Sequence, residues 1–290
     1  MRAMQLVSGS KLKRAQTKLL QGRAVLEFLD GLLKRVLAAT SFDSPHRQTR
    51  LAQDGPERSR GTEGLDHPLC EKRLGGENAL VLITSDAGLC GSYNTNLIQL
   101  AETYLQRDSA RRTQLVSIGK KGYRYFVKRG YAVAESYLDL AGRPNAAQVE
   151  EMGRSLMDRF LSGRVNSVKL LYSRFHSSTV YRPTLRQWLP IQLDRATGKP
   201  TSPPSLEYIF EPSPENIFED LLPRWVLATF QVVLLEAFTS EHSARMIAMK
   251  NATDNAEELL SSLTRQRNKI RQASITKELS EIVGTAEALK

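Results

Sequence analysis

The last third of the chain contains the feature that most constrains its fold, a stretch of 60 residues, 224–283, without proline or glycine. Such a stretch favours one continuous helix, which at 1.5 Å per residue would be ~90 Å long. Soluble helices average about three turns, so a helix of this length indicates a coiled coil or a shaft. Its apolar stripe is narrow, as in a two-stranded coiled coil, and contains Leu259, Leu263, Ile270 and Ala273.

The beginning of this helix can also be predicted. Residues 213–215, Ser-Pro-Glu, combine a hydroxyl cap, a proline in the first turn and an acid at the positive end of the helix dipole. Pro223 follows, so we expect a break or kink within residues 218–222. A row of small side chains at steps of four would let another helix approach closely: Ala244, Ala248, Ala252 and Ala256.

A second helical pattern occupies the N-terminus. Residues 3–39 lack proline, and apolar residues recur at helical spacing among lysines and arginines. Such a helix needs a second surface to pack on. We expect residues 1–39 and residues 212–290 to form a long antiparallel coiled coil. Residues 40–78 are polar and without a period, which predicts a polar loop or flexible linker.

Between these helices, residues 79–211 alternate between strand and helix patterns. Three apolar runs have the form of buried parallel strands, at 79–84, 113–119 and 167–175. Residues 179–191 have the pattern of an antiparallel partner strand, with Pro183 indicating an edge of the sheet. The predicted fold class is therefore mixed, a compact α/β domain around a mainly parallel sheet, flanked by the two helices.

The net charge of +10 is unevenly distributed. Residues 1–60 carry +7 and residues 211–290 carry −3, so the two ends of the chain can attract each other. A basic excess is also typical of nucleic-acid-binding proteins, which leaves a basic coiled-coil nucleic-acid-binding protein as one alternative. Basic residues crowd the stretch 264–283, but it offers no aromatic side chain for stacking on bases.

One turn has the position of a phosphate-binding loop. TSDAGLCGSYN, residues 84–94, follows a strand and precedes a helix. Gly88 and Gly91 match neither the GxGxxG spacing nor a GKS or GKT motif. A nucleotide-binding enzyme therefore stays an alternative to a tight structural turn, in which Asp86 and Ser92 would satisfy backbone donors.

Other catalytic and metal-binding patterns are absent from the sequence. His67 and Cys70 form an HxxC pair, but Cys90 is the only other thiol, and a zinc site needs three or four ligands. Serine hydrolase, protein kinase and zincin signatures are also missing. We expect no catalytic residue, no cofactor and no metal. No run of about 18 apolar residues predicts a membrane span.

Three stretches of the chain resemble the gamma subunit of F-type ATP synthases, the central shaft of the rotor. They are AMQLVSGSKLKRAQ (3–16), LITSDAGLCGSYNTNL (82–97) and the segment 241–283, which begins EHSARMIAMKN. The resemblance implies a coiled coil of N- and C-terminal helices with a Rossmann-like α/β domain at 79–211. The shaft would couple rotation of the membrane c-ring to nucleotide-state changes at the catalytic beta subunits, as a non-catalytic subunit.

Partners and location follow from the same resemblance. The coil would stand inside a ring of alternating alpha and beta subunits, and the α/β domain would bind the epsilon subunit and the c-subunit ring. The chain would be peripheral to the cytoplasmic face of the plasma (inner) membrane, without a membrane-spanning segment and without nucleic acid. In the family, further helix precedes the first matching stretch, so the N-terminal helix is expected to be shortened.

The resemblance also implies roles for single residues. In the family, the arginine, the glutamine and the final threonine of the RQASIT motif contact a loop of the beta subunit, which assigns this contact to Arg271, Gln272 and Thr276. Gln272 and Thr276 are four residues apart and share a face of the helix. Arg245 is assigned a similar contact lower on the shaft. The turn with Asp86, Gly88 and Gly91 would be a structural turn of the α/β domain rather than a nucleotide site.

Overall fold

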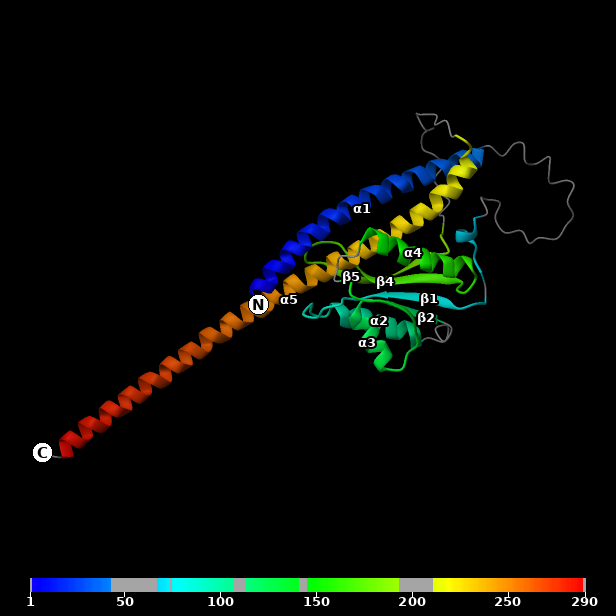
Figure 1. Ribbon diagram of the computed structural model, residues 1–290. Helices are drawn as coiled ribbons and strands as arrows, with labels where there is room; N and C mark the ends of the chain where they lie inside the picture. The colour runs from blue at the N-terminus through cyan, green and yellow to red at the C-terminus, as the bar shows by residue number, and fades with distance from the viewer. Residues whose placement is uncertain are drawn as a thin grey trace, which may run out of the picture.

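The computed structural model describes residues 2–42, 67–73, 75–106, 113–140, 145–192 and 211–288. Two long helices lie side by side, and a small α/β domain is attached to one flank of the pair (Figure 1). The elements in chain order are α1 (Arg2–Phe42), the short 3-10 helix η1 (Pro68–Cys70), β1 (Asn78–Ile83), α2 (Tyr93–Gln106), β2 (Thr113–Ile118), α3 (Lys120–Lys128), β3 (Val133–Tyr137), α4 (Ala146–Leu161), β4 (Ser167–Phe175), β5 (Tyr181–Leu189) and α5 (Pro214–Ala288).

Helices α1 and α5 run antiparallel along the whole of α1, as the sequence predicts (Figure 1). Leu12 and Leu19 of α1 are buried against Val232 of α5. At the start of α1 an ion pair of 3.5 Å joins Arg2 to Glu257. Beyond Glu257, α5 continues to Ala288 without a partner among the described residues, which leaves about 30 residues, or ~45 Å of helix, exposed on all sides.

Of the break or kink expected within residues 218–222, the break is wrong, because α5 is one helix of 75 residues that includes Pro223. Proline removes one backbone hydrogen bond from a helix, a cost of about 3 kcal/mol. Phe218, Leu222 and Val226 lie one turn apart on both sides of it, and all three are fully buried in the core of the α/β domain. Tertiary packing of this face outweighs the local cost, and α5 curves in this region (Figure 1).

The sheet has the strand order β3-β2-β1-β4-β5. β3, β2, β1 and β4 are parallel, and β5 pairs antiparallel with β4 at the edge. Strand β3, the opposite edge, is absent from the sequence prediction. Its five residues alternate between exposed and half-buried positions, so they have no continuous apolar run.

Successive side chains of a strand point to opposite faces of the sheet, and β1 packs on both. Val81 belongs to a core with α4, α5 and the end of α1, and Leu82 belongs to a second core with α2 and α3. Helices therefore cover both faces (Figure 1), which explains the continuous apolar run of β1. The described end of the segment 40–78 also contributes, since Leu69 of η1 is fully buried; residues 43–66 lie outside the described residues.

Two members of the alanine row of α5, Ala244 and Ala248, approach the α/β domain. Ala244 is buried in the second core beside Cys90 and Tyr93. α5 also contains an 18-residue window that could cross a membrane by its length and composition, and 56% of that window is buried inside the protein. Burial of this kind is typical of the core helix of a folded domain.

Candidate functional site

The turn between β1 and α2 is held by side chains of its neighbours. The backbone N–H of Ser85 donates to Asn94 Oδ1 at 3.0 Å. Asp86 Oδ1 accepts hydrogen bonds from the backbone N–H groups of Lys120, at 3.1 Å, and Asp139, at 3.3 Å. Asp86 thus accepts from backbone donors, as predicted. These donors lie just after strands β2 and β3, however, and not in the turn itself. The role predicted for Ser92 within the turn is filled by Asn94, since Ser92 Oγ accepts only from the Asn96 side-chain amide.

The two glycines of the turn are not equivalent. Gly91 has a φ of +58°, and a Cβ there would lie 3.8 Å from Ala248 Cβ of α5. Glycine adopts this left-handed conformation without the steric cost of a side chain. A Cβ at Gly88 would make only ordinary contact with the Lys121 side chain, at 3.5 Å. The backbone conformation therefore favours glycine at residue 91, and the contacts at residue 88 set no such preference.

Arg245 of α5 binds this turn from the outside. Its Nε donates to the carbonyl of Gly88 and its Nη2 to the carbonyl of Ala87, both at 3.1 Å. Nη2 also forms an ion pair of 2.8 Å with Glu241, one helical turn earlier. The side chain of Arg245 is 14% exposed and that of Glu241 is 5% exposed. The guanidinium thus connects α5 to the turn from a largely buried position, and we call this contact of Arg245 the latch.

The electrostatics of the latch are dominated by burial. Desolvation raises the pKa of Glu241, and the charge and hydrogen bond of Arg245 lower it. Asp86 raises the pKa of Glu241 further, while Lys11 of α1 lowers it. The Cys90 thiol, buried beside the latch, also has a raised pKa because it is desolvated.

Helix α5 fills the crevice where a parallel α/β sheet binds nucleotides. That crevice lies outside the carboxyl ends of the strands where the strand order reverses, here between β1 and β4. Ser240 Oγ of α5 donates to the carbonyl of Ser173 at the end of β4, at 2.9 Å. Tyr93 OH, at the start of α2, donates to the carbonyl of Ala237 at 3.0 Å. The protein's own helix is thus bound at the ends of these strands, which argues against the nucleotide site at residues 84–94.

A second joint connects α1, α5 and the sheet. Arg23 Nη2 of α1 pairs with Glu236 Oε1 of α5 at 2.5 Å and donates to the carbonyl of Phe175, at the end of β4, at 3.0 Å. The Glu236 side chain is 7% exposed. Burial, then the charge of Glu236, raises the pKa of the neighbouring Tyr172 to about 12. The two joints fix the coil to the α/β domain at two levels.

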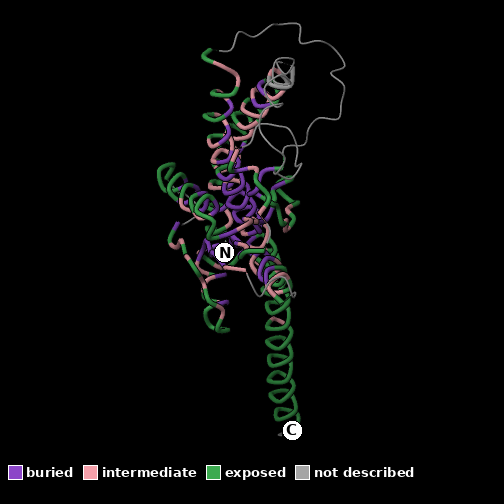
Figure 2. Tube along the Cα trace, turned by 90° about the vertical axis from the view of Figure 1, so that its right-hand side faces the viewer, coloured by how far each residue is buried: buried purple, intermediate pink, exposed green. Residues whose placement is uncertain are grey.

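The residues assigned to a beta-subunit contact lie on the unpartnered end of α5. Arg271, Gln272 and Thr276 are all exposed, in the region where the trace is almost entirely exposed (Figure 2). Thr276 Oγ1 donates to the carbonyl of Gln272 at 2.9 Å, so its lone pairs stay available to a donor from a partner. Arg245 is not near them: it lies on the buried part of α5, bound to the turn.

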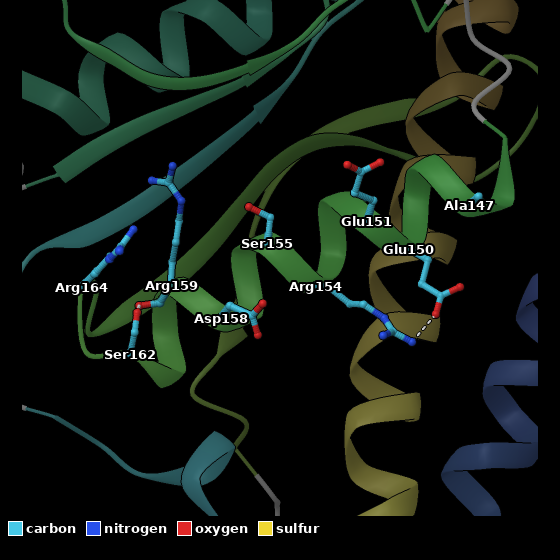
Figure 3. Close-up of a pocket in the computed structure, with 9 residues that line it drawn as sticks. All are labelled: Ala147, Glu150, Glu151, Arg154, Ser155, Asp158, Arg159, Ser162 and Arg164. Atoms are coloured by element: carbon cyan, nitrogen blue, oxygen red, sulfur yellow. Dashed lines mark hydrogen bonds and ion pairs between the residues drawn. The ribbon is translucent and has the colours of Figure 1, made fainter.

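Other candidate sites are occupied by internal contacts. His67 Nδ1 accepts the backbone N–H of Leu69 at 3.1 Å, and no group of three or more metal-ligating side chains occurs in the described part of the chain. An open depression of about 790 Å³ lies along α4, with side chains of both charges (Figure 3). Glu150 and Arg154 pair with each other there, and Arg159 pairs with Glu135. The lining has as many acidic as basic side chains, so it does not favour a ligand of either charge.

Fold and site together define a two-helix shaft that carries an α/β domain whose nucleotide crevice is filled by the shaft itself. The sequence model of the ATP synthase family matches residues 1–289. A relative in Symbiobacterium thermophilum, an ATP synthase gamma chain, is 41% identical over 291 residues, covering all of this chain and 92% of the relative. The gamma chain of Moorella thermoacetica is 38% identical over 289 residues, with 93% of the relative covered. The chain belongs to the ATP synthase gamma chain family.

Solved structures agree with the fold. The central stalk and c-ring structure of the Tetrahymena thermophila mitochondrial ATP synthase contains a chain with a TM-score of 0.56 and 20% identity, covering 87% of this chain and 98% of that one. A chain of the Euglena gracilis mitochondrial ATP synthase has a TM-score of 0.51 and 20% identity, covering 100% and 95%. At this identity the likeness concerns the fold.

Proposed function

We propose that this gamma subunit is the central rotor shaft of a proton-translocating ATP synthase. The observation that carries the proposal is the length of α5, a single helix of 75 residues whose last part, residues 258–288, is almost entirely exposed among the described residues. Eight large apolar side chains on it are 49–66% exposed: Leu259, Leu260, Leu263, Ile270, Ile275, Leu279, Ile282 and Val283.

A single helix with this surface is not expected to stand alone in water. Isolated helices are marginal because nucleation is unfavourable, and most helical stability in proteins comes from packing. Exposed apolar surface of this extent marks a site of interaction with other proteins. A ring of alpha and beta subunits around the helix would cover these side chains.

The coupling would work through differential contact. The described coil is asymmetric, since α1 packs along one side of α5. Inside a ring of three catalytic beta subunits, such a shaft contacts each of them differently. A partner shifts a conformational equilibrium only by its differential affinity for the two states. Rotation of the shaft would therefore exchange the nucleotide affinities of the three sites, and the shaft itself would perform no catalytic step.

We further propose that Arg271, Gln272 and Thr276 contact a loop of the beta subunit. They are exposed, and Gln272 and Thr276 share one face of α5. Each neutral hydrogen bond contributes about 0.5–1.5 kcal/mol and each bond to a charge about 1.5–3. We do not extend this contact to Arg245, because its guanidinium is largely buried and already bound to two carbonyls and a carboxylate.

The α/β domain would bind the epsilon subunit and the c-subunit ring at the cytoplasmic face of the plasma (inner) membrane. The chain would be peripheral there, because the apolar window of α5 packs into the protein core and is not available to a bilayer. This arrangement places the domain at the membrane end of the shaft and the exposed end of α5 inside the catalytic ring.

Co-expression with alpha and beta subunits tests the proposal. We expect a stable complex with ATPase activity and, with the membrane sector added, ATP-driven proton pumping. The double substitution Gln272→Ala with Thr276→Ala should lower hydrolysis and pumping several-fold while the subunit stoichiometry stays intact. Ser274→Ala, on the opposite face of the same turn, is the matched control. Equal activity of the double variant and the control would remove the assigned contact, and failure to assemble would refute the proposed shaft.

A further inference from the structure

Three arginines lie together on one face of the hairpin formed by β4 and β5. In the antiparallel register, Arg174 of β4 stands directly opposite Arg182 of β5, and Arg186 stands opposite Leu170. Side chains on a strand alternate between faces, so Arg174, Arg182 and Arg186 share the face that carries Tyr172. All three are exposed. Arg182 and Arg186 are about 13 Å apart along the strand, and directly opposite residues have Cβ atoms about 5 Å apart.

This placement of charge is unfavourable within the chain. Like charges directly opposite each other on neighbouring strands destabilise a sheet. Among the described residues, none of the three arginines has an acidic group within ion-pair distance. Glu236, which lies beside Tyr172 on this face, is already paired with Arg23. The described residues offer no free negative charge within ion-pair distance to offset this repulsion. We therefore infer that the offsetting charge comes from a partner that binds this surface.

The hairpin lies beside the coil. Gln16 Nε2 of α1 donates to Ser178 Oγ at the hairpin turn, at 3.1 Å, and Ser243 of α5 donates to the carbonyl of the same residue. Strand β5 is also the edge of the sheet, and no further strand pairs with it in the part of the chain that the structure describes. A partner chain that runs along the shaft can therefore reach both the arginines and the strand edge.

We propose that Arg174, Arg182 and Arg186 form a docking surface for an acidic segment of another subunit of the same complex. Arginine suits this contact because its planar group binds carboxylates through two parallel hydrogen bonds. Three charges on one hairpin form a small footprint, which fits a short peptide segment better than the extended contact of nucleic acid. The proposal rests on the proposed function, since it requires that neighbouring subunits surround the coil.

Zero-length cross-linking in the assembled complex tests this surface. Arg182→Lys keeps the charge and adds an amine that a carbodiimide joins to a carboxylate only at ion-pair distance. Gln187→Lys is the matched control, because residue 187 is exposed on the same strand and pairs with Lys169 on the opposite face. We expect a cross-link from position 182 to an Asp or Glu of another subunit, identified by mass spectrometry, at several-fold the yield of the control.

The outcomes distinguish a failure of the docking surface from a failure of the proposed shaft. A complex that assembles and hydrolyses ATP but gives no cross-link from position 182 would overturn the docking surface and leave the shaft in place. A cross-link to a carboxylate of this chain itself, or equal yields from positions 182 and 187, would overturn it as well. A further outcome is that nucleic acid copurifies with the wild type and is lost in the double variant Arg182→Glu with Arg186→Glu. That result would overturn the acidic segment as the partner and identify nucleic acid in its place.

A stability measurement gives an independent readout. Because Arg174 and Arg182 repel each other, Arg182→Gln should leave the melting temperature of the full chain unchanged or raise it. In the complex, the same substitution should let the partner segment dissociate from this surface at a lower salt concentration. A marked fall in melting temperature would mean that Arg182 serves folding, and it would overturn the interpretation of this cluster as an interaction surface.

Discussion

The latch between α5 and the 84–94 turn can be tested by Arg245→Ala. The substitution leaves Glu241 as a buried carboxylate without its cation, since that side chain is 5% exposed. Breaking a buried pair from one side costs about 3–5 kcal/mol. The carbonyls of Ala87 and Gly88 lie at the surface and regain water, so their lost bonds add little. We therefore expect a loss near the lower limit, about 3 kcal/mol, which corresponds to about 6–12 °C in melting temperature for a protein of this size.

The pH dependence of this loss distinguishes the latch from general packing. Burial raises the pKa of Glu241 above its usual 4.5, so the folded state favours the protonated carboxyl, and stability falls as pH rises through the range above 4.5. Removing Arg245 removes a charge that lowers this pKa, so the pKa rises further. The loss should be largest near neutral pH and smaller in more acidic buffer, because the raised pKa of Glu241 in the variant favours the protonated carboxyl there.

Thermal unfolding followed by circular dichroism at both pH values provides the assay. Lys250→Ala is the control, because Lys250 is exposed one turn further along α5. Glu241→Gln should lose little, since the amide oxygen still accepts from Arg245. A loss below about 1 kcal/mol for Arg245→Ala, or the same loss at both pH values, would refute the reasoning.

Three further predictions follow from single contacts. Gly91→Ala should lower the free energy of unfolding by about 1–2 kcal/mol because of its positive φ, whereas Gly88→Ala should change it by less than about 0.5, measured by urea unfolding; equal losses would contradict this difference. Arg23→Ala should cost about 2 kcal/mol, less than a fully buried pair because its side chain is 34% exposed; a neutral result in the same assay would contradict the joint with Glu236. Burial raises the pKa of Cys70 to about 11, so at pH 8 its thiolate fraction should be about a hundredfold below that of a thiol with a pKa of 9. Alkylation of Cys70 should therefore be slow and should accelerate with rising pH. Rapid alkylation of the folded protein would contradict the burial of this thiol.

The shaft could be predicted from the sequence because its signal is local and long. The absence of proline and glycine from residues 224–283 predicts one helix, and of the break or kink expected near Pro223 only the break is wrong. That error has a tertiary cause, since Phe218 and Leu222 anchor the helix on one side of the proline and Val226 on the other. Local rules give the cost of the proline, but not the packing that offsets it.

The site was harder to predict, because its contacts join distant parts of the chain. Arg245 and Glu241 have the i,i+4 spacing of an ordinary surface ion pair, and nothing local indicates that the turn at Gly88, 157 residues earlier, covers them. Strand β3 was missed because alternate burial leaves it without an apolar run. The carboxylate of Asp86 was identified correctly as a partner of backbone donors, whereas its donors, on Lys120 and Asp139, become evident only in the folded sheet.

Rotation of this chain inside its complex is the most direct test of the proposed shaft. A bead can be attached through Lys128→Cys, at an exposed position on α3, while Cys70 and Cys90 react slowly because burial raises the pKa of both thiols. With the alpha and beta ring fixed to a surface and ATP supplied, we expect the bead to turn continuously in one direction. A bead that stays still while the same complexes hydrolyse ATP would contradict the account.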